Sequence, residues 1–164
     1  MNILYIHGLN GSLNPEKREV LEPYGKVFSP SIDYEADSEA IVHLVESFKS
    51  HHTNVVIGSS MGGFTGYYVS NIYQCPALLF NPALAERSVY QNIPEIEHKT
   101  SPFKQIVLGT KDDIVDPKQT LGFLAETLIY HPEYKVHIHN SLAHRIPLDV
   151  FEEEVKLFFK QLSK

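Results

Sequence analysis

From residue 54 to residue 66 the chain reads Asn54-Val55-Val56-Ile57-Gly58-Ser59-Ser60-Met61-Gly62-Gly63-Phe64-Thr65-Gly66. A short β-branched run comes first, the pattern Gly-x-Ser-x-Gly follows it, and an amphipathic segment comes last. This order predicts a strand, a tight turn and a helix, which is the setting of a nucleophile elbow. A serine hydroxyl is a weak nucleophile, so such a turn is needed to expose it to a base and to backbone donors for an oxyanion.

Two adjacent serines compete for the position of the nucleophile. A side chain two positions before or after the nucleophile would crowd the turn, so glycine is favoured at both places. Ser60 has Gly58 and Gly62 there, whereas the same positions around Ser59 hold an isoleucine and a methionine. The spacing favours Ser60, although Gly-x-Ser-x-Gly by itself also occurs in ordinary turns that end strands.

Length and composition indicate one domain, residues 1–164, that would bury about two-thirds of the surface of its unfolded chain. The net charge of −6 comes without a basic cluster, which argues against a nucleic-acid partner. It leaves neutral, cationic and anionic small molecules open as ligands. Cys75 is the only cysteine, so an internal disulfide is excluded and a small buried side chain is expected.

Neither a leader segment nor a membrane span is expected. The chain enters a strand pattern at once, and no apolar run reaches the roughly 18 residues that would cross a bilayer. We therefore expect a cytoplasmic protein that contacts no membrane.

Short apolar runs alternate with segments of helical period along the whole chain, which predicts an α/β protein. The runs at residues 3–6, 55–57 and 106–108 are apolar without alternation, as strands covered on both faces should be. We therefore expect a three-layer α/β/α sandwich around a mostly parallel sheet of about six strands. The predicted strands are residues 2–7, 26–29, 54–58, 77–81, 105–109 and 135–139.

Segments of helical period separate these strands. One begins near Ser38, and another follows the elbow and ends at Cys75. Asp116 stands before a proline, which is typical of a helix cap followed by the first helical residue. The C-terminal segment carries an apolar stripe that predicts core packing (Phe151, Val155, Phe158, Phe159 and Leu162).

Acyl transfer by a serine needs a base that takes the hydroxyl proton and an acid that orients the base. In doubly wound hydrolases both follow the serine, acid first, each in a loop after a later strand. The strand at residues 105–109 leads into a loop with Asp112, Asp113 and the helix cap Asp116, at the sheet edge where ligands bind. Asp112 and Asp113 both remain candidates. Asp112 is favoured because it comes first after the strand and because Ile114 and Val115 should turn inward beneath the loop.

Nine histidines compete for the position of the base. His144 lies in the loop after the last strand, where the base of such a site belongs. Position argues against the others, which end the first strand, lie on a surface helix, precede the acid, or precede or lie within the last strand (His7, His43, His51, His52, His98, His131, His137 and His139).

An oxyanion hole needs two backbone N–H groups, and one normally comes from the residue after the nucleophile, here Met61. The second is expected from the loop after the first strand. Gly8 allows that loop to turn sharply, so that the amide of Leu9 can face Ser60.

With these motifs in order, the chain resembles an α/β-hydrolase. Residues 4–12, Leu-Tyr-Ile-His-Gly-Leu-Asn-Gly-Ser, together with Ser29-Pro30 and Gly-Ser-Ser-Met-Gly-Gly, are similar to the small esterases of the YqiA type. The resemblance implies a minimal α/β-hydrolase fold and gives Ser60, Asp112 and His144 the roles of nucleophile, acid and base. It favours Asp112 over Asp113, because the acid of this family typically lies three residues after the strand-ending glycine.

The resulting interpretation is a carboxylester hydrolase that works through an acyl-enzyme on a small-molecule ester, without a cofactor or metal. The connection over residues 81–104 is only long enough for a small cap, which predicts short acyl chains. A thioesterase or acyltransferase with the same triad and a catalytically idle binding protein are alternatives. A metal-dependent hydrolase is another, with His137, His139, His144 and an Asp112 or Asp113 carboxylate as ligands, although no His-Glu-x-x-His spacing supports it. The sequence leaves the oligomeric state open.

Overall fold

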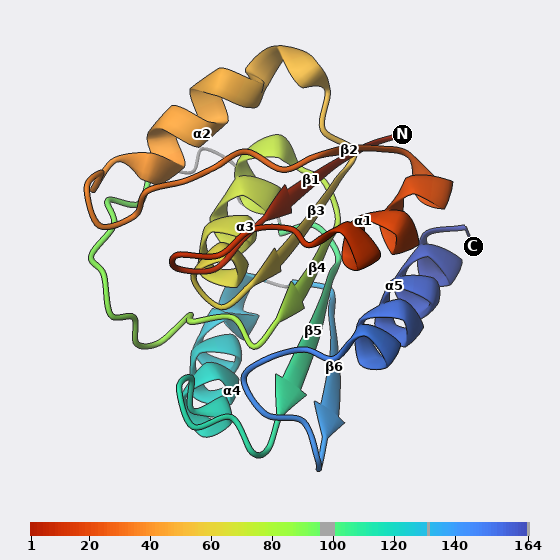
Figure 1. Ribbon diagram of the computed structural model, residues 1–164. Helices are drawn as coiled ribbons and strands as arrows, with labels where there is room; N and C mark the ends of the chain where they lie inside the picture. Colours follow the sequence, from red (N-terminus) through yellow and green to blue (C-terminus); the bar gives the residue numbers. More distant parts are fainter. Residues whose placement is uncertain (96–100, 131, 164) are drawn as a thin grey trace.

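A parallel sheet forms the centre of the computed structural model, which describes residues 1–95, 101–130 and 132–163 (Figure 1). Within these residues the sheet has six strands in the order β2-β1-β3-β4-β5-β6, and all neighbouring strands are parallel. The strands are β1 (Asn2–Ile6), β2 (Lys26–Phe28), β3 (Val55–Ser59), β4 (Ala77–Phe80), β5 (Lys104–Gly109) and β6 (Tyr134–His139). The predicted sheet is therefore confirmed, with every strand end within one residue of its expected position.

Helices cover both faces of the sheet (Figure 1). Helices α2 (Ala40–Phe48), α3 (Met61–Tyr73) and α4 (Pro117–Glu126) lie on one side, and α1 (Pro15–Leu21) and α5 (Leu148–Leu162) lie on the other. Short 3-10 helices follow several of them: η1 (Glu22–Tyr24), η2 (Lys49–His51) and η3 (Thr127–Tyr130). The predicted three-layer α/β/α arrangement is thus confirmed.

Two apolar clusters hold the layers together, one on each face of the sheet. The first joins the sheet to α2, α3 and α4 and includes Leu4, Val56, Phe64 and Leu124. The second joins the sheet to α1 and α5, and it contains the expected α5 stripe at Phe151, Val155, Phe158 and Phe159. Strands β1, β3, β4 and β5 are buried along almost their whole length because they contribute side chains to both clusters.

Helix caps explain where two of the helices begin. The Asp116 carboxylate accepts the Lys118 N–H at 2.9 Å, as the Asp-Pro pair predicts. The Asn14 side chain accepts the Lys17 N–H at 2.9 Å in the same way, and Pro15 then opens α1. Helix α1 was not predicted from the sequence, although Asn14-Pro15 carries the same signal as Asp116-Pro117.

The parallel arrangement brings the carboxyl ends of all six strands to the same edge of the sheet. The loops after β1, β3, β4, β5 and β6 therefore meet there, and these loops and the first residue of α3 contain all the residues expected to act in catalysis. In the part of the chain that is described, no helix has the length and apolar character needed to cross a membrane.

Candidate active site

Ser60 lies at the junction of β3 and α3 with backbone angles φ 56° and ψ −120°. A positive φ is unusual for a residue with a side chain, and it is the conformation that a sharp strand-to-helix turn imposes. Both elbow glycines are required by close backbone contacts. A Cβ at Gly58 would lie 2.2 Å from the Gly62 carbonyl oxygen, and one at Gly62 would lie 2.0 Å from the Ile6 carbonyl oxygen. The strained turn therefore falls on Ser60, while Ser59 ends the strand.

The loops after β5 and β6 bring Asp112 and His144 together. Nδ1 of His144 lies 3.0 Å and 2.9 Å from the two carboxylate oxygens of Asp112, and the Asp112 side chain is fully buried. Oδ1 of Asp112 also accepts the backbone N–H groups of Ile114 and Val115, each at 2.9 Å. These bonds fix the carboxylate, which in turn fixes the orientation of the imidazole ring.

The neighbours of Asp112 take other positions. Asp113 is exposed, and Asp116 caps α4. Val115 is buried as expected, but the expectation that Ile114 turns inward is wrong, because its side chain is 70% exposed. The reason is the tight turn closed on the Asp112 carboxylate, which points the two consecutive apolar side chains in different directions.

The loop after β1 lies directly against the elbow. A Cβ at Gly8 would lie 3.3 Å from Cβ of Ser60 and 3.8 Å from its Oγ. The backbone at Gly8 therefore passes close to the Ser60 side chain. Leu9 from this loop and Met61 from the elbow, whose amides are the expected oxyanion donors, both line the same cleft as Ser60.

His7 holds this loop in place. Its Nε2 accepts the Ile32 N–H at 3.0 Å, so the ring proton is on Nδ1, which donates to the Gly8 carbonyl oxygen at 2.7 Å. The Tyr34 hydroxyl donates to the His7 carbonyl oxygen at 3.0 Å. Sequence reasoning rejected His7 as a base and missed this structural task, which its place before Gly8 in the loop could have suggested.

Asn81 connects the loops that carry the candidate acid and the candidate base, and this role was not predicted either. The residue directly follows β4, is buried, and has a φ of 40°. Its Oδ1 accepts the Gly109 N–H at 2.8 Å, while its Nδ2 donates to the carbonyl oxygens of Ala143 and His144 at 3.0 Å and 3.2 Å. One side chain thus ties the end of β4 to the end of β5 and to the loop after β6.

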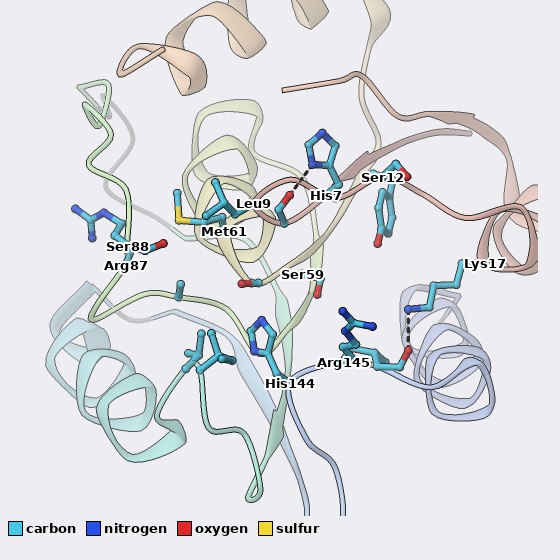
Figure 2. A pocket seen from close by; sticks show the side chains of 18 of the residues that line it. His7, Leu9, Ser12, Lys17, Ser59, Met61, Arg87, Ser88, His144 and Arg145 are labelled. Atoms are coloured by element: carbon cyan, nitrogen blue, oxygen red, sulfur yellow. Dashed lines mark hydrogen bonds between the residues drawn. The ribbon is translucent and has the colours of Figure 1, made fainter. Parts of the chain in front are cut away.

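A cleft with a volume of about 760 Å³ lies at this edge of the sheet (Figure 2). Leu9, Ser60, Met61 and His144 line it, so the structure gathers the candidate nucleophile, base and oxyanion loop in one place. In the described residues, no hydrogen bond joins the Ser60 hydroxyl to the His144 ring. Other charged residues also line the cleft, from the loop after β4, from α1 and from the loop after β6 (Glu86, Arg87, Lys17 and Arg145).

Two other histidines that were considered as metal ligands pair elsewhere. His137 and His139 of the edge strand β6 each lie 2.7 Å from a carboxylate oxygen of Glu154, which is buried on α5. They do not share a partner with His144. Within residues 1–95, 101–130 and 132–163, no group of three or more histidine, cysteine or acidic side chains is arranged to hold a metal ion. His98 and His131 lie outside the described residues.

Several solved structures share this fold. SOBER1 of Arabidopsis thaliana matches with a TM-score of 0.71 at 16% identity, over 100% of this chain and 99% of that one. A Bacillus cereus carboxylesterase matches with a TM-score of 0.65 at 16% identity, over 96% and 87% of the two chains. Esterase 2 of Thermogutta terrifontis, phosphonylated by cyclosarin, matches with a TM-score of 0.74 at 15% identity, over 99% and 81%. The expected α/β-hydrolase fold is therefore confirmed.

The sequence itself matches a family model over residues 2–105, which is more than half of the chain. That segment contains the loop after β1, the elbow and all of β4. The chain belongs to the uncharacterised protein family UPF0227.

Proposed function

We propose that this protein is a serine hydrolase that cleaves small carboxylic esters through an acyl-enzyme. The observation that carries the proposal is Ser60 in its strained turn, in one cleft with a histidine that a buried aspartate orients. A strained backbone conformation costs free energy that the surrounding packing must offset. Such residues are therefore found most often at functional sites. Similarity of fold to esterases supports the same activity.

In the proposed reaction, Nε2 of His144 takes the proton from Ser60 while Oγ attacks the ester carbonyl carbon. The amides of Leu9 and Met61 stabilise the oxyanion that forms. His144 then gives the proton to the leaving alcohol, and the acyl group stays on Ser60. In the second half, His144 takes a proton from water, and the hydroxide attacks the acyl carbonyl carbon. The bond from that carbon to Oγ then breaks, the acid leaves, and His144 returns the proton to Ser60. The Asp112 carboxylate orients the imidazole and balances its positive charge.

The missing hydrogen bond between Ser60 and His144 is consistent with this sequence of steps. Such bonds are often long without substrate and shorten in the reacting complex. We expect the bond to form when an ester occupies the cleft.

Short acyl chains are the proposed substrates. The connection between β4 and β5, residues 81–103, is short enough to supply only a small cap, and its described part contributes Glu86, Arg87 and Ser88 to the cleft. A structure of the Thermogutta terrifontis esterase with propionate bound supports a small acyl group. Hydrolysis of 4-nitrophenyl esters from acetate to decanoate should fall as the chain lengthens, and a steady rise would contradict this part of the proposal.

The decisive test is labelling with a fluorophosphonate probe, followed by mass spectrometry of the modified residue. Wild-type protein should carry the adduct on Ser60, while Ser60→Ala should carry none. The matched control is Ser59→Ala, which removes the neighbouring hydroxyl and should still be labelled. If folded wild-type protein is not labelled at all, the site is a binding site with an idle serine.

A further inference from the structure

The charge of the cleft is opposite to the charge of the chain. The whole sequence has 14 basic and 20 acidic residues, for a net charge of −6. The described residues that line the cleft include three cations, Lys17, Arg87 and Arg145, and one carboxylate, Glu86. None of the three cations forms an ion pair with a described residue. A field of one sign that is focused into a cleft raises the local concentration of ligands of the opposite sign.

Lys17 of α1 is less exposed to water than Arg145, the other cation on this side of the cleft. Its ammonium group donates to the Ile146 carbonyl oxygen at 2.8 Å and lies 5.2 Å from the centre of the Phe151 ring. Burial lowers the pKa of this lysine below its ordinary value. A partly desolvated cation without a counter-charge is stabilised when an anion binds beside it.

Arg145 presents a second cation next to the candidate base. It directly follows His144, is exposed, and lines the cleft. Figure 2 shows the Lys17 and Arg145 side chains on the same side of His144, and the bond from Lys17 to Ile146 brings the ammonium group next to this stretch of chain. A guanidinium group offers a rigid pair of donors that matches a carboxylate or a phosphate.

Arg87 lies on the other side of the cleft and is engaged differently. Its guanidinium carbon lies 4.2 Å from the centre of the Phe64 ring, so this cation is stacked on an aromatic side chain of α3. Figure 2 draws Arg87 away from the other two cations, so Lys17 and Arg145 are the two cations that lie together on one side of His144.

We propose that Lys17 and Arg145 form a subsite for an oxyanion group, so that the ester substrate carries a carboxylate or a phosphate in addition to its ester bond. This inference rests on the proposed function and names the substrate class of the same site. The net charge of the chain left neutral, cationic and anionic ligands open, and the subsite favours an anionic one.

Pairs of esters that differ only in charge test the subsite. 4-Acetoxybenzoate and 4-acetoxybenzamide place the difference on the alcohol side, and monomethyl succinate and methyl succinamate place it on the acyl side. 4-Acetoxyphenyl phosphate distinguishes a phosphate from a carboxylate. In at least one pair the charged member should have a kcat/KM about tenfold or more above that of the neutral one, as expected for a charge-assisted hydrogen bond. The preference should shrink as salt is added.

Variants connect the preference to the two cations. Lys17→Gln and Arg145→Gln should each reduce the ratio of charged to neutral kcat/KM, and Lys17→Arg should restore it. The matched control is Lys156→Gln, an exposed lysine of α5 that does not line the cleft, which should leave the ratio unchanged. Equal kcat/KM values in both pairs, or a preference that neither variant reduces, would overturn the subsite while the neutral esters still report the hydrolase.

A protein without hydrolase activity would give a different set of results from a hydrolase without the subsite. If no ester is cleaved and Ser60 is not labelled, the proposed function is wrong, and the subsite is then tested by binding alone. Calorimetry with Ser60→Ala protein should show 4-acetoxybenzoate binding about tenfold more tightly than 4-acetoxybenzamide, and Arg145→Gln should remove the difference. Equal binding of the two compounds would refute the subsite.

Discussion

At the scale of single residues, the Asn81 side chain fixes the relative position of the candidate acid and base. Its three hydrogen bonds reach Gly109, Ala143 and His144. Asn81→Ala removes all three bonds, and we expect kcat to fall about 10- to 100-fold because small errors in alignment are costly in catalysis. Asn81→Asp keeps the acceptor for Gly109 but sets a carboxylate against two carbonyl oxygens, so it should be no better.

The measurement is kcat and KM on a neutral short ester, together with a thermal melt to confirm folding. Asn140→Ala is the matched control, since Asn140 is an exposed asparagine near His144. An Asn81→Ala enzyme with wild-type kcat would show that the loops keep their alignment without this side chain.

The two adjacent aspartates, Asp112 and Asp113, should differ in their effect on catalysis. Asp112→Asn should lower kcat by about 10⁴-fold, as expected when the acid of a triad can no longer hold the correct tautomer of its histidine. Asp113→Asn is the natural control, because Asp113 is exposed while Asp112 bonds to His144. Comparable losses in the two variants would show that the acid is assigned to the wrong residue.

At the scale of elements, the packing of the elbow against β1 makes Gly62 irreplaceable. An alanine there would place a Cβ 2.0 Å from the Ile6 carbonyl oxygen, so β1 or α3 would have to move. We expect Gly62→Ala to lower the free energy of unfolding by about 3 kcal/mol or more.

Gly122 of α4 provides a control of opposite sign. A Cβ at this position meets nothing within 4 Å, and glycine inside a helix costs conformational entropy. Gly122→Ala should therefore raise the free energy of unfolding by about 0.5–1 kcal/mol. Urea unfolding curves measure both changes, and an unchanged stability of Gly62→Ala would contradict the tight contact.

The same elements show how far the sequence could predict the structure. Strands such as β3 and β5 were predictable because burial on both faces leaves an uninterrupted apolar run. Ser60, Asp112 and His144 could be assigned to loops at one edge because parallel strands all end there. Helix α1 has only seven residues and buries only Leu21, so its apolar pattern was too short to detect.

Other features depend on contacts between distant segments. The bonds of Asn81 join residues that are 28 to 63 positions apart, and no local pattern encodes them. The outward turn of Ile114 depends on the conformation of a loop closed by Asp112. The charge of the cleft depends on α1, which contributes Lys17 and was itself missed.

At the scale of the whole molecule, a buried lysine couples stability to pH. Lys104 begins β5 and is fully buried, with its ammonium group 2.7 Å from Oδ1 of Asn71 and 2.7 Å from Oγ of Ser101. Burial lowers the pKa of this lysine from 10.5 to about 7. Between about pH 7 and pH 10.5 the unfolded chain therefore binds more protons at this site than the folded protein does.

The sign of the effect follows from proton linkage. Stability should rise with pH through this window, because the cost of burying the charge disappears as the folded lysine loses its proton. Lys104→Met should abolish this contribution, so the stability of wild type relative to the variant should increase on the order of a few kcal/mol from pH 7 to pH 10. Urea unfolding across this range, with the exposed Lys156→Met as control, measures the difference. A pH-independent difference would show that Lys104 keeps its ordinary affinity for protons.

The backbone of Ser60 has an evolutionary consequence. Angles of this kind cost about 1–3 kcal/mol in a residue with a side chain, and glycine adopts a positive φ much more easily. A single mutation to glycine at this position should therefore make the protein more stable. Where the hydroxyl has no function, selection for stability should favour that mutation, since gains of this size raise the amount of folded protein in a cell. We therefore predict that homologues keep a serine at this position only where its hydroxyl is needed, because the hydroxyl is retained at a cost in stability.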